Sequence, residues 1–190
     1  MTTAEATLFG MGQFWLQDGG TPPAVETWDQ SNGLAVTADV GAVILTGDAY
    51  GPVQVAVDVR AERPPEADDP FAFGDGSEWD DIVEVSVTCR EGPLNVGALE
   101  GELSDELPAV DTRGAGSYRV RVHTRDRDDP GVDDDGMPRP NDRFLLVSWP
   151  APPQPPLLIR LTDRRGLGTR MAWVKRLSRG RPPARGDDSG

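Results

Sequence analysis

Residues 116–125 constrain the fold more than any other stretch, because apolar and polar side chains alternate along them. The apolar members are Tyr118, Val120 and Val122, and the polar members between them are Arg119, Arg121 and His123. A period of two is typical of a β-strand with one apolar and one polar face. We therefore expect the tyrosine and the two valines to be buried, and the arginines and the histidine to lie at the surface.

Other stretches carry similar strand patterns and are separated by turns. In residues 53–59 four valines alternate with other residues, and residues 143–149 are apolar almost throughout. The 22 glycines and 18 prolines favour many turns over long helices. Further strands are predicted over residues 8–17, 82–89 and 157–162, with one or two strands in 34–46. Residues 95–108 fit either a helix or a strand, a turn and a second strand.

Many short strands between turn signals predict an all-β fold, an antiparallel β-sandwich. We assign residues 5–163 to this one domain. From residue 164 the chain becomes a basic tail, in which a short helix is predicted over residues 168–178, with Met171, Val174 and Leu177 on one side. The last residues, 180–190, hold no apolar side chain larger than alanine or proline, and are predicted to be disordered.

Charge is distributed unevenly along the chain. Residues 1–159 hold 10 basic and 29 acidic side chains, a net of −19, whereas residues 160–190 hold 9 basic and 3 acidic ones, a net of +6. An acidic body repels a phosphate backbone, which argues against direct nucleic-acid binding by it and favours a basic partner. The tethered basic tail is expected to contact this body weakly. The alternative is that the acidity serves only solubility.

The cellular compartment is predicted from cysteine usage and from the N-terminus. Cys89 is the single cysteine, so an internal disulfide cannot form, as is usual in a reducing cytosol. The first seven residues resemble no signal peptide, and no apolar run approaches the length of a membrane span. We expect a cytoplasmic protein without a membrane span.

Catalytic chemistry has little support in the sequence. A nucleophile and base pair would have to use His123, which is predicted to be a surface residue, or Cys89, which continues the inward face of its strand. No grouping of cysteine and histidine suits zinc, and no glycine-rich nucleotide-binding motif is present. We expect a protein that is not an enzyme and has no cofactor.

Two acidic loops, residues 61–81 and 125–142, contain clusters of carboxylates. The clusters are Asp75, Glu78, Asp80 and Asp81 in the first loop, and Asp126, Asp128, Asp129, Asp133, Asp134 and Asp135 in the second. Loops at the end of a β-sandwich can bind Ca²⁺ through such oxygens, but neither cluster matches the spacing of an EF-hand loop. Solvated acidic loops are the commoner outcome.

The N-terminal third resembles a known family. The stretches that carry the resemblance are 12–23, then Thr27-Trp28-Asp29, then 33–43, which are similar to the competence protein J family. Members of that family are small inhibitors of a bacterial DNA-entry nuclease. The resemblance covers about residues 8–60, and it implies a non-catalytic protein that blocks a basic nuclease. Other stretches, 116–123 and 149–153, resemble uncharacterised actinobacterial proteins.

Together these features predict an acidic protein-binding domain with a basic protein, by resemblance a nuclease, as its partner. Trp79 is the expected aromatic anchor, because interfaces concentrate binding energy in a few buried aromatic side chains. The expected partner-binding residues are Asp75, Glu78, Trp79, Asp80 and Asp81. Trp79 could instead fold back onto the sheet edge. The alternative function is a calcium-binding or scaffold module with a partner that is not a nuclease.

Overall fold

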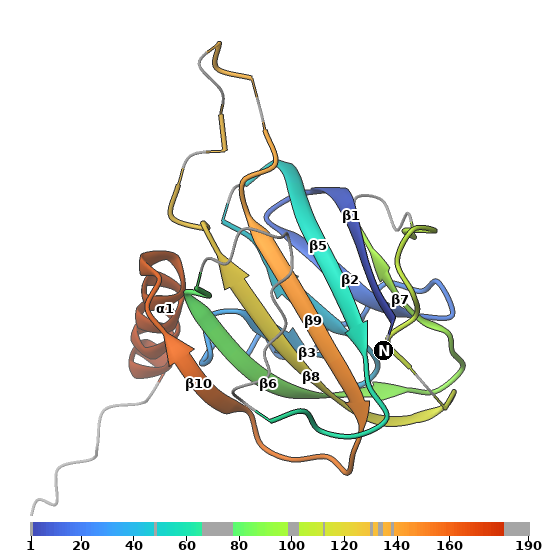
Figure 1. Ribbon diagram of the computed structural model, residues 1–190. Coiled ribbons are helices and arrows are strands. Elements are labelled where there is room, and N and C mark those ends of the chain that lie inside the picture. The colour runs from blue at the N-terminus through green and yellow to red at the C-terminus, as the bar shows by residue number, and fades with distance from the viewer. Residues whose placement is uncertain are drawn as a thin grey trace, which may run out of the picture.

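The structure, a computed structural model, describes residues 2–47, 49–65, 78–98, 103–111, 113–129, 131–132, 135–137 and 139–180. Two β-sheets and one C-terminal helix make up this part of the chain (Figure 1). The strands are β1 Thr2–Gly10, β2 Gln13–Asp18, β3 Ala35–Thr37, β4 Ala42–Leu45, β5 Gly51–Val59, β6 Asp81–Cys89, β7 Leu94–Gly97, β8 Gly116–Arg125, β9 Arg143–Pro150 and β10 Leu157–Leu161, and the helix is α1, Arg164–Gly180.

The larger sheet has six strands in the order β1-β5-β9-β8-β6-β10, and the smaller has four in the order β3-β4-β2-β7. The neighbours β5 and β9 run parallel, with Gln54 opposite Arg143 and Val59 opposite Ser148. The predicted all-β, purely antiparallel sandwich is therefore wrong, because one sheet is mixed and a full helix follows it. The periodic pattern locates a strand but does not determine the direction of its neighbour.

The core lies between the two sheets and is formed by the apolar face of each strand. The prediction for β8 is confirmed for Tyr118, Val120 and Val122, which are all buried. The valines of β5 are buried as predicted up to Val57, while Val59 is partly exposed. Residues 34–46 form two strands, and residues 94–97 form a strand instead of a helix.

Arg119 and Arg121 are buried on the opposite face of β8, so the prediction that they reach solvent is wrong. Arg121 Nε donates to Glu84 Oε1 at 3.0 Å, and its Nη2 donates to the carbonyl of Pro64 at 3.2 Å. Arg119 Nη1 donates to the carbonyl of Gln154 at 2.9 Å. The outer face of the larger sheet is thus covered by other segments. An alternating pattern shows which side chains of a strand are polar, but it does not show whether they are exposed to solvent.

His123 is also fully buried, which corrects its prediction as a surface residue. One nitrogen of its ring lies 3.1 Å from the carbonyl oxygen of Leu145, and its ring centroid is 5.4 Å from that of Trp79. Trp79 has therefore folded back onto the outer face of the larger sheet. It belongs to a small apolar cluster there with Leu145 and Val147.

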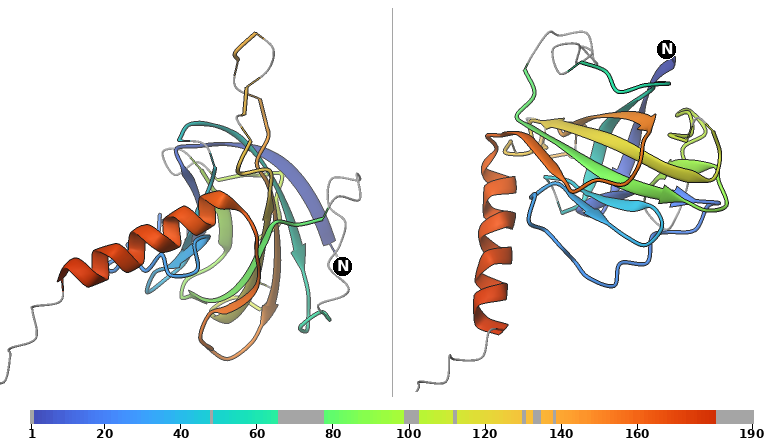
Figure 2. Two further views of the ribbon diagram at one scale, coloured as in Figure 1. Left: turned by 90° about the vertical axis from the view of Figure 1, so that its left-hand side faces the viewer. Right: turned by 90° about the horizontal axis from the view of Figure 1, so that it is seen from below.

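Helix α1 follows β10 and extends away from the sheets, so that only its first half lies against them (Figure 2). It spans Arg164–Gly180 and is longer than the helix predicted over residues 168–178. The predicted disorder of residues 180–190 concerns almost entirely residues outside the described part of the chain. Within the described part, no helix has the length and apolarity needed to cross a membrane.

Candidate functional site

The predicted partner-binding residues lie where the chain enters β6, and most of them have internal roles. Trp79 is only 7% exposed, and the guanidinium of Arg125 lies 5.2 Å from the centre of its ring. Asp81 is completely buried. Glu78 is exposed and pairs with Arg160, and Asp80 accepts a hydrogen bond from the backbone of Asp126. Asp75 lies outside the described residues.

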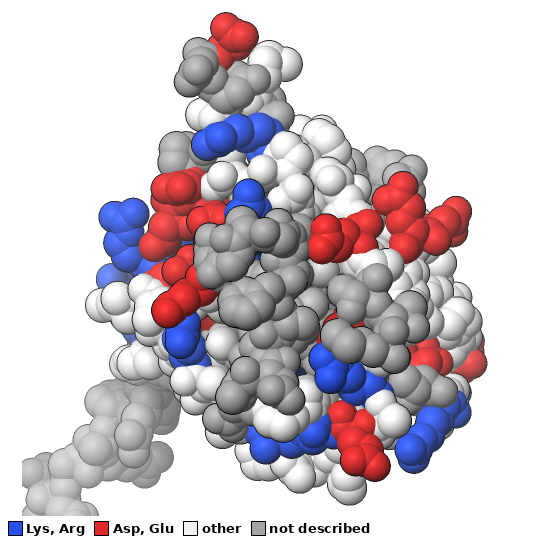
Figure 3. Space-filling view, in the orientation of Figure 1, with Lys and Arg blue, Asp and Glu red and all other residues white. Residues whose placement is uncertain are grey.

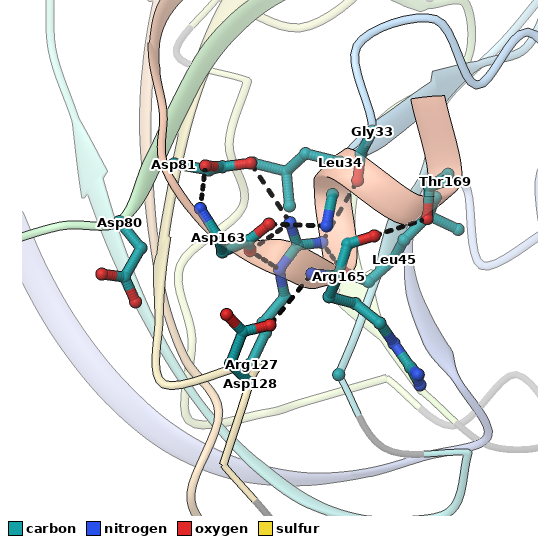
Figure 4. Close-up of polar contacts among 12 residues, drawn as sticks. Gly33, Leu34, Leu45, Asp80, Asp81, Arg127, Asp128, Asp163, Arg165 and Thr169 are labelled. Carbon is teal, nitrogen blue, oxygen red and sulfur yellow. Dashed lines mark hydrogen bonds and ion pairs between the residues drawn. The ribbon is translucent and has the colours of Figure 1, made fainter. Parts of the chain in front are cut away.

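Asp81 belongs to a buried ion cluster, together with Arg127 and Asp163 (Figure 4). The Arg127 Nη2 atom lies 2.5 Å from Asp163 Oδ2 and 3.4 Å from Asp81 Oδ2. Its Nη1 donates to the backbone carbonyls of Gly33 and Leu45, in the smaller sheet and the loop before it. One guanidinium therefore joins both sheets to the start of α1.

The same cluster fixes the direction in which α1 leaves the body. Asp81 Oδ1 accepts hydrogen bonds from the backbone N–H groups of Thr162, at 2.6 Å, and Asp163, at 3.0 Å. From within the helix, Arg170 Nη1 lies 3.3 Å from Asp81 Oδ2. Gly166 packs so closely that a Cβ built on it would lie 2.6 Å from Asp81 Oδ2 and from Asp163 Oδ1. These contacts attach the first two turns of α1 to the body of the protein.

Two carboxylates cap the N-terminus of α1. Asp163 accepts from the backbone N–H of Gly166 at 2.5 Å, which is the geometry of an N-cap. Asp128 accepts from the backbone N–H groups of Arg164 and Arg165, at 2.8 and 2.9 Å. Burial raises the pKa of Asp163, and Arg127 opposes this only in part. Burial would also raise the pKa of Asp128, but its hydrogen bonds with the helix outweigh that effect and lower it.

An apolar stripe of exposed side chains runs along α1. It is formed by Leu167, Met171, Val174 and Leu177, which are between 50% and 63% exposed. Their spacing of four, three and three residues places them along one side of a helix. After Trp173, which is half-buried, every side chain of the helix up to residue 179 is exposed. The apolar stripe therefore continues past the point where the body supports the helix.

The rest of α1 is strongly basic. Its 17 residues include Arg164, Arg165, Arg170, Lys175, Arg176 and Arg179, and no acidic residue. Arg164 pairs with Asp128, and Arg170 is used by the ion cluster. Lys175 and Arg179 form no ion pair with the described part of the chain. The change of composition at residue 164 indicated this charge, but exposure of the apolar stripe could not be read from the sequence.

A shallow acidic groove of about 340 Å³ lies on the other side of the molecule, between β1 and residues 103–106. Its apolar lining includes Leu8 and Phe9 of β1 and Leu103, and its rim includes Asp105 and Glu106. Glu5 lies farther along β1, where it shares a second hollow with Glu106. Phe9 is half-exposed, and its ring centroid lies 5.6 Å from that of Tyr50, with the two rings tilted relative to each other. Figure 3 shows acidic side chains gathered over β1 and the neighbouring loop.

β1 contributes an edge to this acidic groove. It is the first strand of the larger sheet and pairs with β5 alone among the strands of the described chain. Residues 103 and 104 attach instead to the smaller sheet, since Ser104 donates from its backbone to the carbonyl of Val96. Because its two walls come from different sheets, the groove could not be recognised from sequence spacing.

The residues considered for catalysis are placed unfavourably for it. Burial, followed by a hydrogen bond to Asp18, raises the pKa of the Cys89 thiol to about 12, so the thiol stays protonated at neutral pH. His123 lies under Trp79, away from solvent. Of the second acidic cluster, Asp126 faces Arg125 and Arg143, and Asp128 caps α1. Within the described ranges no three potential metal ligands gather at one point.

Comparison with known proteins identifies no family. No family model matches the chain, and no curated protein matches it. A solved structure named crocagin biosynthetic gene J aligns with a TM-score of 0.43 and 16% sequence identity, over 80% of this chain and 98% of that one. A likeness at this level supports no conclusion about function. None of these findings concerns competence protein J, so that resemblance stays a hypothesis.

Proposed function

We propose that the protein is a non-catalytic binding module that docks on an acidic partner through α1. The observation that carries this proposal is the exposed apolar stripe on a helix attached to the body by the buried ion cluster. An exposed row of aliphatic side chains beside cations is typical of a helix that binds in a partner's groove. Anchoring lowers the cost of binding, because the helix is ordered before the partner arrives.

The magnitudes favour an acidic partner over an uncharged one. Full burial of one such aliphatic side chain contributes about 1.5–3 kcal/mol, so four half-exposed ones contribute about 3–6 kcal/mol. Association costs roughly 4–15 kcal/mol in lost freedom of motion. Apolar burial alone therefore falls short of this cost over most of its range. The cations Lys175, Arg176 and Arg179 must add favourable interactions, which requires carboxylates or other anions on the partner.

The test compares two methionines of nearly equal exposure. Met171 lies in the apolar stripe and is 63% exposed, and Met137 lies in the loop between β8 and β9 and is 62% exposed. We expect a host protein that is retained by the wild type and by Met137→Glu to be lost by Met171→Glu, with affinity measured on the purified pair. If Met171→Glu binds that protein as tightly as Met137→Glu does, α1 is not the docking element.

A second candidate function is recognition of a basic protein, with a nuclease suggested by the resemblance alone. The observation that favours it is the acidic groove, where Asp105 and Glu106 border an apolar floor next to the Phe9–Tyr50 pair. Of the residues predicted from sequence, Glu78 and Asp80 lie beside β10 and β6, at the opposite edge of the larger sheet from the groove. Trp79 and Asp81 would have to leave the interior to reach a partner.

This second candidate has its own test. Replacing Asp105 by Asn and Glu106 by Gln is expected to slow association with a basic partner and to flatten its salt dependence, because long-range attraction acts on the association rate. Unchanged association kinetics would contradict it.

Calorimetry with Ca²⁺ tests the calcium-binding alternative, and a partner that is not a nuclease would support the scaffold alternative. A cytoplasmic location is part of the same proposal.

A further inference from the structure

The apolar stripe belongs to α1 and the acidic groove is lined by β1, and these two elements lie on opposite sides of the molecule (Figure 1). We propose that the acidic groove of one copy binds α1 of a second copy, so that the chain associates head to tail. This inference rests on the proposed docking role of α1 and names a second copy of the chain as an occupant that fits it.

The two surfaces match in length and in chemistry. From Leu167 to Leu177 the apolar stripe extends about 15 Å along the helix axis. The acidic groove and the adjoining hollow that Glu5 shares with Glu106 together follow β1 from Glu5 to Phe9, which extends about 14 Å. The apolar stripe would face the exposed apolar side chains of the groove lining, Phe9 and Leu103.

The charges at the two surfaces are opposite. Lys175 and Arg179 are exposed on the free half of α1, and Asp105 and Glu106 are exposed on the rim of the acidic groove. A contact between copies places these two pairs near each other without burying either of them fully. The association is therefore expected to weaken as salt is added, whereas an association driven by apolar contact alone, or opposed by the net charge of −13, would strengthen.

A contact within one molecule is prevented by the way in which α1 is anchored. The buried ion cluster, with Asp163 as the N-cap, fixes the start of the helix. The helix then points away from the body, and β1 lies across the larger sheet from it (Figure 2). Because donor and acceptor surfaces differ and lie far apart, the contact is heterologous and extends to more than two copies.

Sedimentation velocity of the full chain over a concentration series, at low and at high salt, tests this. We expect a progressive series of oligomers at low salt and a dissociation constant at least tenfold weaker at high salt. A chain that stays monomeric at every concentration at low salt overturns the proposal. So does an association that strengthens with salt. Binding to anionic lipid vesicles in place of self-association would identify a different occupant and would also overturn it.

Charge reversal supplies the decisive comparison. Lys175→Glu with Arg179→Glu reverses the charge on the free half of α1. Asp105→Lys with Glu106→Lys reverses the charge on the rim of the acidic groove. Each variant alone should lose at least tenfold in self-association, while an equimolar mixture of the two should associate again, because each then meets its opposite charge. A chain with all four changes should also associate. No recovery in either case overturns the proposal, and circular dichroism confirms that each variant is folded.

The outcome is separable from that of the proposed function. If the wild type stays monomeric but Met171→Glu still loses a host partner that Met137→Glu retains, then α1 docks on another protein and only the inference of self-association fails. If self-association is confirmed and no other partner depends on α1, the second copy is the partner.

Discussion

Arg127 is the residue on which the position of α1 depends most. Its guanidinium contacts two buried carboxylates, those of Asp81 and Asp163, and two backbone carbonyls from the region of the smaller sheet. Removing one partner of a buried ion pair leaves an uncompensated charge, which costs more than the pair itself contributes. The side chain therefore supports both the sheets and the helix.

We expect Arg127→Met to lower the free energy of unfolding by about 3–5 kcal/mol, because Asp81 and Asp163 would lose their shared cation. Urea denaturation measures this. The matched control is Arg90→Met, since the side chain of Arg90 pairs at the surface with the exposed Asp39, and about 1 kcal/mol or less is expected there. Equal losses in the two variants would show that the cluster does not hold the fold.

Asp18 is a second residue with a large structural role. Its carboxylate accepts from the backbone N–H groups of Arg90, Glu91 and Gly92, which form the turn between β6 and β7. Burial would raise the pKa of Asp18, but these hydrogen bonds outweigh it and lower the pKa below the ordinary value. A folded pKa below the unfolded one stabilises the protein above the unfolded pKa, and the contribution is lost as pH falls through the folded pKa.

Asp18→Asn is accordingly expected to lower the free energy of unfolding at pH 7 by about 1–3 kcal/mol. The difference from the wild type should shrink below about pH 4, where the unfolded aspartate becomes protonated, and vanish below the folded pKa. Urea denaturation at a series of pH values measures this. Asp39→Asn is the control, because Asp39 is exposed and pairs with Arg90 at the surface. A difference that stays constant down to acid pH would contradict the prediction.

At the scale of the elements, two glycines in α1 that look alike in sequence have opposite surroundings. A Cβ at Gly166 would collide with Asp81 and Asp163, whereas a Cβ at Gly168 would meet nothing within 4 Å. Alanine is favoured over glycine in a helix by about 1 kcal/mol. Gly168→Ala should therefore raise the free energy of unfolding by about 0.5–1 kcal/mol, and Gly166→Ala should lower it. Urea denaturation of the two variants measures both changes. A Gly166→Ala variant that is more stable than the wild type would show that α1 does not pack against Asp81 and Asp163.

The sequence identified most strands because their signals are local. Tyr118, Val120 and Val122 were assigned to the core from periodicity alone, and this is confirmed. The start of α1 had a local signal that was missed, since Asp163 is an N-cap residue immediately before the helix. The burial of Arg121 had no local signal in the sequence. The groups that accept its hydrogen bonds, the carbonyl of Pro64 and the carboxylate of Glu84, come from distant segments.

The candidate site was less accessible to sequence reasoning than the fold. Asp81 was predicted to bind a partner, whereas in the structure it is buried and holds Arg127 and the backbone at the start of the helix, which only the tertiary structure reveals. The acidic groove joins β1 to residues 103–106, and nothing in the spacing of those two segments indicates that they meet. Charge patterning located the basic helix and could not show which of its faces the body leaves exposed.

At the scale of the whole molecule, the larger sheet is built from pairings between distant parts of the chain. Thr2 lies opposite Val59, Gln54 opposite Arg143 and Glu84 opposite Leu157. The parallel pair of β5 and β9 can form only when the long segment between them, which contains β6, β7 and β8, closes into a loop. Closing such long loops costs entropy before any strand contact compensates for it.

Refolding is therefore expected in milliseconds to seconds, or more slowly, rather than in microseconds. Stopped-flow tryptophan fluorescence can follow it, because Trp79 and Trp149 become buried on the larger sheet. The attachment of α1 requires Asp81, Arg127 and the smaller sheet to be in place, so it should come late. Arg127→Met should then accelerate unfolding much more than it slows folding, whereas Val122→Ala, in the middle of β8, should slow folding. Refolding completed within the dead time of mixing, or an Arg127→Met variant that mainly folds more slowly, would contradict this order of events.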